Sequence, residues 1–506
     1  MDRYASVPYD SRPIAESDPA HLATLAYLHG LDPAPPAEAR ILELGCAGGG
    51  NLLPLAARWP GSRCVGVDLS AAQVAAARRL ATAAGLGNVE LLSADLAALD
   101  PATLGEFDYV IAHGVYSWVP APVRAALLGL CRACLAPHGI AFVSYNTLPG
   151  WRLRGMLRDF LGCTGDADAD PAAQAARGRA ALQRLHAALD GLDDLAARYL
   201  RAEIPALLAA GDGYLLHEYL AAENHACLFR DFVAEAAAHG LRHVADAQPH
   251  TEFAASLGAA AETALEGLDD PLERGQWLDF VYSRKLRRSL LCHAARLPAL
   301  DLERFGGCAF SADLAPPPKL DLRRPRPAPF ALADGSRVEV HHPLTRAALL
   351  ELGRRYPAAL PLEPLWQAAA ATLRGAGAAA QADALPHLAA ELFSLFAHGA
   401  VRAHLVPRPG VVGPAERPAA TPLARAAAAA GMALATLDHE ALELDPFGAR
   451  LLQSLDGSTT LEALVEGLGA ELLQGVLPPP RELRAADRGD PQRLQRALLE
   501  LCRGRV

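Results

Sequence analysis

Three acidic residues are placed where they could bind one ligand. One lies just before a glycine-rich turn, and the other two follow the next two short apolar runs. Glu43 precedes Gly45-Cys46-Ala47-Gly48, and Asp68 and Asp95 follow the next two apolar runs along the chain. Because glycine has no Cβ atom, a ligand can approach the backbone of such a turn closely. A carboxylate beside the turn repels the two phosphates of a dinucleotide, which favour a helix N-terminus free of negative charge. The turn therefore favours a positively charged ligand over NAD, although the glycine spacing alone also fits a loose dinucleotide fingerprint.

S-adenosylmethionine has this chemistry, because it carries an ammonium and a sulfonium group and no phosphate. We expect Glu43 to select that ligand, Asp68 to accept hydrogen bonds from the ribose hydroxyls, and Asp95 to accept from the adenine amino group. The predicted cofactor-binding residues are Glu43, Gly45, Cys46, Ala47, Gly48, Asn51, Asp68, Leu69, Gln73, Ala94, Asp95, Leu96 and His113.

A second group of residues follows two later apolar runs and is suited to a methyl acceptor. His113, Tyr116 and Trp118 come after residues 107–112, and Tyr145 and Asn146 come after residues 139–144. In doubly wound sheets ligands bind outside the carboxyl ends of the strands, so these side chains are predicted to face the acceptor. Aromatic faces can hold an ammonium group, and a histidine can serve as a base or orient the acceptor. We predict catalytic roles for His113, Tyr116, Trp118, Tyr145 and Asn146.

The elements that must position these residues alternate between strands and helices. Residues 41–44, the glycine turn, a helix over 51–59 and a strand over 64–67 form a nucleotide-binding βαβ unit. The pattern predicts an α/β fold with a Rossmann-like seven-stranded sheet. The further strands are expected at 89–92, 107–112, 139–144, 241–245 and 308–312, with a helix over 271–293.

The remaining segments predict helical insertions and two further small domains. Residues 151–225 are helical and alanine-rich, which suits a lid, a dimer face or both. Because the last strand of the sheet is expected at 308–312, the first domain is expected to span 1–315. Proline-rich linkers precede residues 330–406 and 423–506. Both of these segments combine short strands with helices, which is typical of winged-helix-like α+β domains, and the few basic residues on the helices of 330–406 favour an interaction module there.

Composition limits the class of protein and its partners. The chain has 506 residues, a formal net charge of −10, 51% apolar and 21% charged residues, which describes a globular protein and argues against a nucleic-acid-binding face. Without a signal peptide or spanning segment, and with nine scattered cysteines, it is expected in the cytoplasm without stable membrane insertion. Cys131-x-x-Cys134 lies in a helical stretch without a second pair or nearby histidines, and His217-Glu218 with His225 lacks the His-Glu-x-x-His spacing, so no metal is predicted.

The motifs of the glycine turn and of the acids that follow it, taken together, resemble those of a known family. Glu43 to Gly50, Asp68 and Ala94-Asp95 resemble the cofactor motifs of the class I S-adenosylmethionine-dependent methyltransferases, with Ala47 where many members carry glycine, so a slightly tighter pocket is expected. The family resemblance narrows further through three segments, which are Tyr9-Asp10-Ser11-Arg12-Pro13, His113-Gly114-Val115-Tyr116-Ser117-Trp118 and Tyr145-Asn146-x-x-Pro149-Gly150-Trp151.

These segments are similar to bacterial methyltransferases that carry a methyltransferase regulatory domain, and the likeness covers roughly the first 300 residues. Among these enzymes are protein-lysine methyltransferases that act on outer-membrane proteins. The resemblance implies a protein-lysine substrate and a helical dimerisation insert.

Two alternatives remain open from the sequence. A small-molecule amine, hydroxyl or acid could be the methyl acceptor, or the chain could be a non-enzymatic S-adenosylmethionine-binding scaffold. The chain lacks an Asn/Asp-Pro-Pro-Tyr motif, which argues against adenine and glutamine acceptors. No lysine precedes Lys285, so no lysine base exists in the first 284 residues.

Overall fold

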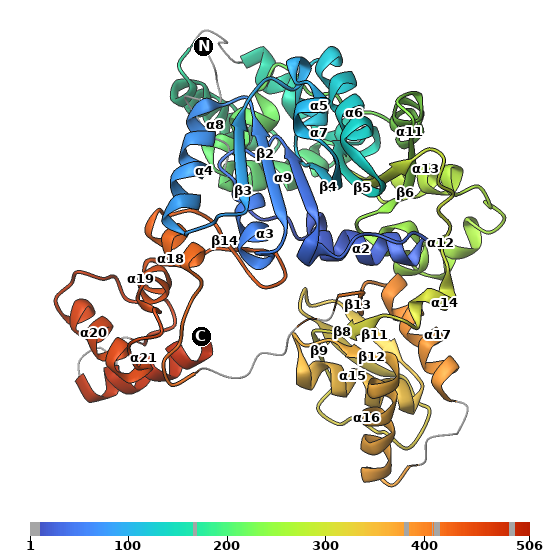
Figure 1. Ribbon diagram of the computed structural model, residues 1–506, viewed down its shortest axis with the longest axis vertical. Coiled ribbons are helices and arrows are strands. Elements are labelled where there is room, and N and C mark those ends of the chain that lie inside the picture. Colours follow the sequence, from blue (N-terminus) through green and yellow to red (C-terminus); the bar gives the residue numbers. More distant parts are fainter. Residues whose placement is uncertain are drawn as a thin grey trace.

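The computed structural model contains three bodies, with the sheet-containing core at the top of Figure 1, a middle domain below it and a C-terminal domain at the lower left. The residues that it describes are 11–164, 169–378, 384–406, 408, 415–484 and 491–505.

A seven-stranded sheet in the order β3-β2-β1-β4-β5-β7-β6 forms the centre of the core. The first five strands in that order are parallel, and β7 runs antiparallel to both β5 and β6. The strands are β1 (Arg40–Leu44), β2 (Arg63–Asp68), β3 (Val89–Ser93), β4 (Phe107–Ala112), β5 (Leu135–Asn146), β6 (Leu241–Asp246) and β7 (Leu286–His293). The predicted Rossmann-like seven-stranded sheet is confirmed.

Helices cover both faces of this sheet, which explains why its central strands are almost continuously apolar (Figure 1). On one face, α6 (Ala121–Cys134) and α11 (Phe229–Ala238) enclose a compact cluster of buried side chains. On the other, α2 (Pro19–Leu28) lies between the sheet and the middle domain. The buried cluster around α2 continues into the middle domain and into the first helix of the C-terminal domain. Three bodies that share one apolar core are held in a fixed arrangement.

The seventh strand differs from the prediction. Residues 309–311 form β8 (Ala309–Ser311), which pairs with β12 (Leu360–Pro361) and β13 (Arg402–His404) in a separate sheet. The core's last strand is instead β7, and the helix expected over 271–293 ends at Val281, as α13 (Pro271–Val281). Division of the chain at residue 315 stays a prediction, but the change of sheet falls between β7 and β8.

A buried charge network explains why β7 was missed. Arg287, in the middle of Leu286-Arg287-Arg288-Ser289, is 1% exposed, and its guanidinium contacts Asp279 at 2.9 Å and Asp246 at 3.6 Å. Arg284 lies on the same two acids, at 2.7 Å from Asp279 and 3.4 Å from Asp246. An arginine at a buried strand position breaks the apolar pattern, and only the fold supplies the carboxylates that permit it.

The helical insertion forms a bundle with an apolar cluster of its own. Its elements are α7 (Leu148–Thr164), α8 (Pro171–Ala188), α9 (Leu195–Ala209), α10 (Asp212–Tyr214) and the π-helix η5 (Leu215–Tyr219). The insertion predicted at 151–225 therefore corresponds to a real helical unit that begins at Leu148.

The middle domain combines short strands with helices, as the sequence predicted, and it also includes β9 (Leu314–Ala315), which was not predicted. Its other elements are β10 (Ala328–Leu332), β11 (Arg337–Val340), α15 (Pro343–Arg355), α16 (Leu362–Gly375), α17 (Ala384–Ala397) and β13. The winged-helix-like character of this domain stays a prediction.

The described residues of the C-terminal domain form a small hairpin and four helices. Its elements are α18 (Pro422–Ala429), β14 (Leu434–Ala435), β15 (Ala441–Leu442), α19 (Pro446–Ser454), α20 (Leu461–Leu473) and α21 (Pro491–Arg505). Helix α18 packs against α4 (Ala71–Ala83) of the core, and the helices α19 to α21 share a separate apolar cluster.

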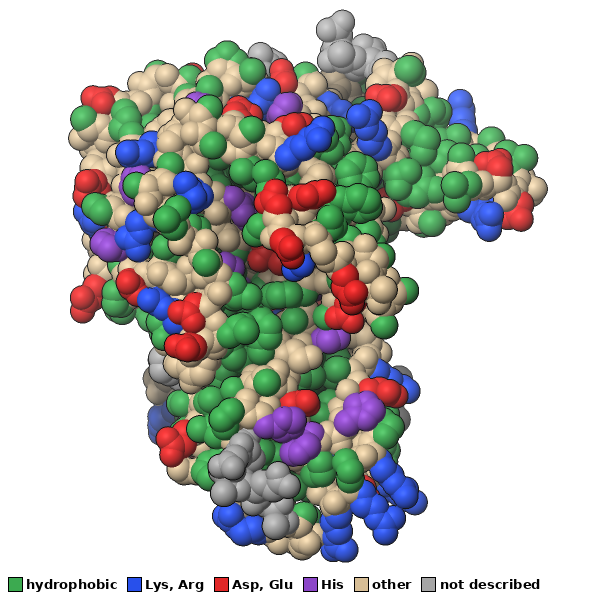
Figure 2. Space-filling view, turned by 90° about the vertical axis from the view of Figure 1, so that its right-hand side faces the viewer, with side chains coloured by type: hydrophobic (Ala, Val, Ile, Leu, Met, Phe, Trp, Pro, Cys, Tyr) green, Lys and Arg blue, Asp and Glu red, His purple; other side chains and the backbone are tan. Residues whose placement is uncertain are grey.

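Charge on the surface is mixed. Figure 2 shows acidic and basic side chains interspersed over the upper body, with basic side chains gathered mainly toward the lower end of the middle domain. In the described part of the chain, no helix has the length and apolarity that crossing a membrane would need.

Candidate functional site

The glycine turn connects β1 to α3 (Leu52–Arg58) in a backbone conformation that favours small residues. Gly45 has φ +82°, and a Cβ built there would lie 2.3 Å from Val115 Cγ2. Ala47 has φ +47°, the left-handed region in which alanine is strained and glycine is not. Position 47 therefore favours glycine. Alanine there strains the backbone of the turn, in addition to the narrower pocket that the sequence predicted.

Asp68, at the end of β2, holds this turn. Its Oδ2 accepts a hydrogen bond from the Ala47 N–H at 2.8 Å, and its Oδ1 accepts from the Ser70 N–H at 2.8 Å. Each carboxylate oxygen can accept more than one hydrogen bond, so both remain able to receive a ribose hydroxyl. The sequence predicted a ligand role for Asp68 but did not reveal that this residue also fixes the strained turn.

Glu43 lies beneath the turn, 4% exposed, with unequal surroundings for its two oxygens. Its Oε1 accepts from Asn51 Nδ2 at 2.9 Å, whereas its buried Oε2 has no hydrogen-bond partner among the described residues. Burial raises the pKa of Glu43 to about 7, against the lowering effect of the Asn51 hydrogen bond. A buried acceptor without a partner fits a cationic donor group such as an ammonium, and it is unsuited to a phosphate.

The other predicted cofactor residues lie along the same edge of the sheet. Asp95 is exposed and caps the short helix η3 (Leu96–Ala98) by accepting from the Ala97 N–H at 2.9 Å. Ala94 donates its N–H to the Asp68 carbonyl at 3.0 Å, which ties the end of β3 to the end of β2. Gln73 is buried on α4, Leu69 is exposed, and burial raises the pKa of the Cys46 thiol.

Replacing Asp68 with alanine is expected to weaken cofactor binding by about 1.5–3 kcal/mol, the size of a hydrogen bond to a charged group. Part of the loss comes from release of the Ala47 and Ser70 N–H groups. Calorimetric titration with S-adenosylhomocysteine measures it, with the exposed Asp32→Ala as a control. Unchanged affinity in Asp68→Ala would refute the ribose assignment.

His113 follows β4 and is held as a neutral imidazole. Burial and the nearby Arg288 lower its pKa to about 4, and the Glu16 carboxylate opposes this only in part. Its Nδ1 is buried and has no hydrogen-bond partner among the described residues. A neutral histidine with an unpaired nitrogen can orient an acceptor, but this low pKa makes it a weak base at pH 7.

Tyr116 and Tyr145 are packed into the core, which departs from the expectation that they face the acceptor. Both are fully buried against Phe232 of α11, with the Tyr145 and Phe232 rings stacked 3.8 Å apart. The Tyr116 hydroxyl donates to Glu235, and the Tyr145 hydroxyl lies 3.1 Å from Ser289 Oγ. The sequence could not reveal that α11, about ninety residues after Tyr145, covers these rings. Their catalytic roles stay predictions.

Trp118 and Asn146 lie at the ends of β4 and β5, where the chain after the helical insertion returns to the sheet. Trp118 is half-buried, and its ring meets that of Trp151 edge-on at 5.9 Å. Asn146 Nδ2 donates to Asn224 Oδ1 at 3.0 Å, and the His225 N–H donates to the Ser117 carbonyl at 2.7 Å. The sequence prediction did not include Trp151 and Asn224 among the site residues, because their proximity depends on this return of the chain.

The segment before α2 covers the glycine turn. Ser11 Oγ accepts from the Gly50 N–H at 2.7 Å, and a Cβ at Gly50 would lie 2.2 Å from the Ser11 carbonyl oxygen. The Ile14 N–H donates to Asn51 Oδ1 at 2.9 Å. Of the N-terminal motif, Tyr9 and Asp10 lie outside the described residues.

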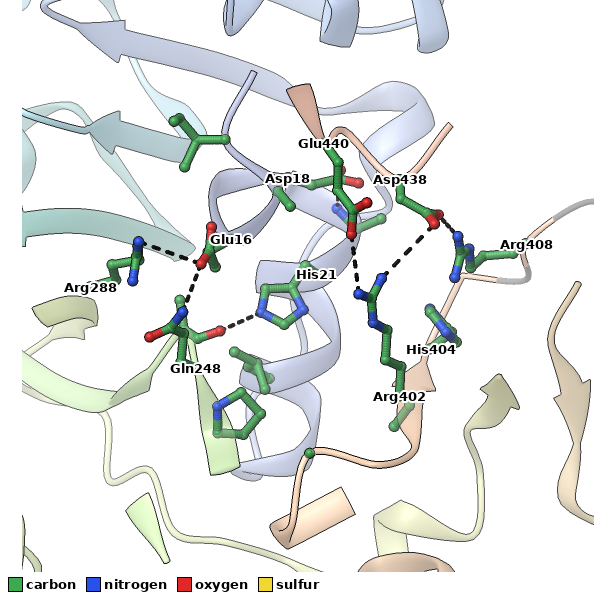
Figure 3. A pocket seen from close by; sticks show the side chains of 18 of the residues that line it. Glu16, Asp18, His21, Gln248, Arg288, Arg402, His404, Arg408, Asp438 and Glu440 are labelled. Carbon is green, nitrogen blue, oxygen red and sulfur yellow. Dashed lines mark hydrogen bonds and ion pairs between the residues drawn. The ribbon is translucent and has the colours of Figure 1, made fainter. Parts of the chain in front are cut away.

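A cavity of about 540 Å³ lies where the three bodies meet. Figure 3 shows two charged groups in its wall, Glu16 with Arg288 and Gln248 on one side, and Arg402 with Asp438 and Glu440 on the other. Gln248 Nε2 donates to Glu16 at 2.9 Å, and Arg402 contacts Glu440 at 3.1 Å. Glu16 and Arg288, which line this cavity, are also the charges that shift the pKa of His113 at the end of β4.

Known families match three separate parts of the chain. A "Methyltransferase domain" matches residues 41–139, a "Predicted methyltransferase regulatory domain" matches residues 211–293, and a "PKMT, C-terminal winged helix domain" matches residues 416–504. The first covers the glycine turn and the acids at the ends of β1 to β3. The third confirms the winged-helix character that the sequence predicted for the last domain.

Relatives and solved structures agree with these matches. Uncharacterized protein RP789 of Rickettsia prowazekii is 37% identical over 290 residues, 57% of this chain and 52% of that protein, so the match spans about half of that relative. Uncharacterized protein RP028 of the same organism is 35% identical over 233 residues, 46% of this chain and 93% of that protein. PKMT2 from Rickettsia typhi superposes with a TM-score of 0.87 at 25% identity over 98% of both chains, and it has also been solved in complex with AdoHcy.

The fold and the site define a class I S-adenosylmethionine-dependent methyltransferase, and the cofactor is S-adenosylmethionine. Within that class the chain belongs to the PKMT type, because the regulatory domain, the C-terminal winged helix and the full-length structural match occur together.

Proposed function

We propose that this chain transfers the methyl group of S-adenosylmethionine to a lysine side chain of a protein. The observation that carries the donor half is the buried Glu43 Oε2, which has no partner among the described residues and suits the donor's ammonium. The acceptor half is supported by the match of all three bodies to PKMT2, since PKMT denotes a protein-lysine methyltransferase. A trans-aconitate 2-methyltransferase of Azoarcus is 37% identical over 102 residues, 20% of this chain and 37% of that enzyme. This similarity supports the methyl donor and not the choice of acceptor.

The cofactor, when bound, supplies a methyl group already activated by its sulfonium, so positioning accounts for most of the rate. Glu43, Asp68 and Asp95 would hold its amino acid, ribose and adenine parts along one edge of the sheet. An amine acceptor must be neutral when it attacks. A histidine with a pKa of about 4 is too weak a base to deprotonate it efficiently at pH 7. We therefore assign His113 an orienting role and expect the amine to lose its proton to water.

Trp118→Ala is expected to lower turnover on a protein acceptor by roughly 2- to 30-fold, the loss of one aromatic face under an ammonium. The affinity for S-adenosylhomocysteine is expected to stay within about twofold of the wild type. Initial rates and calorimetry on the same preparation separate the two effects. Trp59→Ala, another half-buried tryptophan on the far end of α3, is the matched control. Equal losses of turnover and cofactor affinity in Trp118→Ala would remove Trp118 from the acceptor site.

We propose that the acceptor approaches through the cavity at the junction of the three bodies. Support comes from its size, from Glu16 and Arg288 in its wall, whose charges act on His113, and from acids that can receive a basic side chain.

We also propose that the chain forms a homodimer through the helical insertion. Leu195 is 80% exposed there, and Leu153, Met156 and Leu192 are also exposed apolar residues.

A cytoplasmic location is consistent with nine cysteines that are all free thiols.

The direct test is incubation of the purified chain with methyl-labelled S-adenosylmethionine and a bacterial lysate. We expect label in protein, on lysine by mass spectrometry, and much less label with Glu43→Gln when S-adenosylmethionine is limiting. Label in small molecules alone would support a small-molecule methyltransferase. Cofactor binding without any transfer would support a non-enzymatic scaffold.

A further inference from the structure

The C-terminal domain reaches the cofactor site through one residue of its hairpin. His439 lies in the turn between β14 and β15, is 2% exposed, and places its Nε2 2.7 Å from Asn51 Oδ1. Its φ of +58° is a left-handed conformation, which a residue other than glycine keeps only where its surroundings hold it. The turn's own hydrogen bonds hold this backbone, from the Thr436 N–H to the Glu440 carbonyl and from the His439 N–H to the Thr436 carbonyl, and the Nε2 contact joins the ring to the core.

Asn51 connects His439 to Glu43. Asn51 Oδ1 also accepts from the Ile14 N–H at 2.9 Å, a group that can only donate. Since Oδ1 faces donors, the amide is oriented so that Nδ2 donates to Glu43 Oε1, at 2.9 Å. That bond fixes the carboxylate, and the second oxygen of Glu43, Oε2, is the one without a partner.

The direction of each hydrogen bond in this chain is determined. Burial lowers the pKa of His439 to about 4, so the imidazole is neutral at pH 7. An amide oxygen can only accept, so Nε2 must carry the hydrogen and donate to Asn51 Oδ1. The hydrogen bonds therefore run from the imidazole through the amide to the carboxylate, and Asn51 Oδ1 accepts from the Ser17 hydroxyl at 3.2 Å as well as from Ile14 and His439.

We propose that His439 is a positioning residue for the methyl donor, through the chain His439–Asn51–Glu43, and that it couples docking of the winged-helix domain to binding of the donor's ammonium group. The proposal rests on the cofactor site described under the proposed function. By linkage, a hydrogen bond that favours the ammonium-binding arrangement of Glu43 is itself favoured when the ammonium is bound.

Removal of the imidazole leaves the domain attached. Helix α18 packs against α4, and its Leu423, Ala427 and Ala428 belong to the continuous apolar core. Asp438 forms ion pairs with Arg402 and Arg408 of the segment after α17. A variant at position 439 is therefore expected to fold with its domains in place.

The test compares two ligands that share a nucleoside and differ in the amino acid part. S-adenosylhomocysteine carries the ammonium, and 5′-methylthioadenosine lacks it. His439→Gly removes the donor and suits the left-handed backbone, and His439→Gln returns a neutral N–H donor at similar reach. Leu437→Ser, at an exposed side chain of the same turn, is the matched control.

Calorimetry is expected to show a roughly 5- to 10-fold loss of affinity for S-adenosylhomocysteine in His439→Gly, the size of one hydrogen bond. Affinity for 5′-methylthioadenosine should be unchanged, His439→Gln should recover most of the loss, and Leu437→Ser should match the wild type. The proposal is overturned if His439→Gly binds both ligands normally, loses both equally, or is not rescued by glutamine. Wild-type chain that binds neither ligand would refute the cofactor site itself.

Discussion

Replacing Glu43 with glutamine is expected to weaken binding of S-adenosylmethionine by on the order of 10- to 100-fold, because a hydrogen bond to a charged group is worth about 1.5–3 kcal/mol. Glutamine keeps the size of the side chain and can still pair with Asn51, so the loss isolates the negative charge. Calorimetry with S-adenosylhomocysteine measures it, and the exposed Glu38→Gln serves as the matched control. Wild-type affinity in Glu43→Gln would mean that the ammonium binds elsewhere.

The same carboxyl group predicts the pH dependence of binding. Burial raises the pKa of Glu43 to about 7, with a further raising effect from Asp68 and an opposing one from Asn51. The ammonium favours the ionised form, so affinity should rise as pH increases toward 7, by up to about tenfold per pH unit, and then level off. Glu43→Gln should remove this rise. An equally steep rise in the variant would assign the titration to another group.

The stability of the ligand-free chain should change in the opposite direction. The folded pKa of Glu43 lies above its ordinary value of 4.5, so the folded chain binds more protons than the unfolded chain between these values. This contribution to stability is present below about 4.5 and is lost as pH rises through about 7. Above pH 7, Glu43→Gln is therefore expected to be more stable than the wild type without ligand, although it binds the cofactor less well.

Replacing Asp279 with alanine is expected to destabilise the core by about 3–5 kcal/mol, the cost of removing one partner from a buried ion pair. Asp279 is 0% exposed, and its loss leaves the guanidinium groups of Arg284 and Arg287 with Asp246 as their one remaining acidic partner among the described residues.

Urea denaturation followed by circular dichroism measures this loss. The exposed Asp269→Ala, which precedes α13, is the matched control and should change stability by less than about 0.5 kcal/mol. A loss below about 1 kcal/mol in Asp279→Ala would show that the two arginines find water or other acceptors.

The sequence predicted the elements whose apolar pattern is set locally. The strands β1 to β5 contain short apolar runs, and those of β1 and β2 end at a glycine and at an acid, signals that are visible in the sequence. It failed at β7, because Arg287 looks like a surface residue until Asp279 and Asp246 are placed beside it. A buried charge depends on partners from other elements, and no local pattern encodes them.

The site shows the same division. The positions of Glu43 and Asp68 follow from the ends of β1 and β2, so their proximity could be predicted from the order of elements. Burial of Tyr145 depends on Phe232, and the environment of Asn51 depends on His439, 388 positions away. Contacts at that separation are decided by how the bodies pack, which the sequence of either segment leaves open.

The most direct test of the central claim is a crystal structure of the chain with S-adenosylhomocysteine. The account predicts the ligand's ammonium on Glu43 Oε2, its ribose hydroxyls on Asp68 and its adenine next to Asp95. A ligand found outside the glycine turn, or bound there with these three carboxylates turned away from it, would contradict the account.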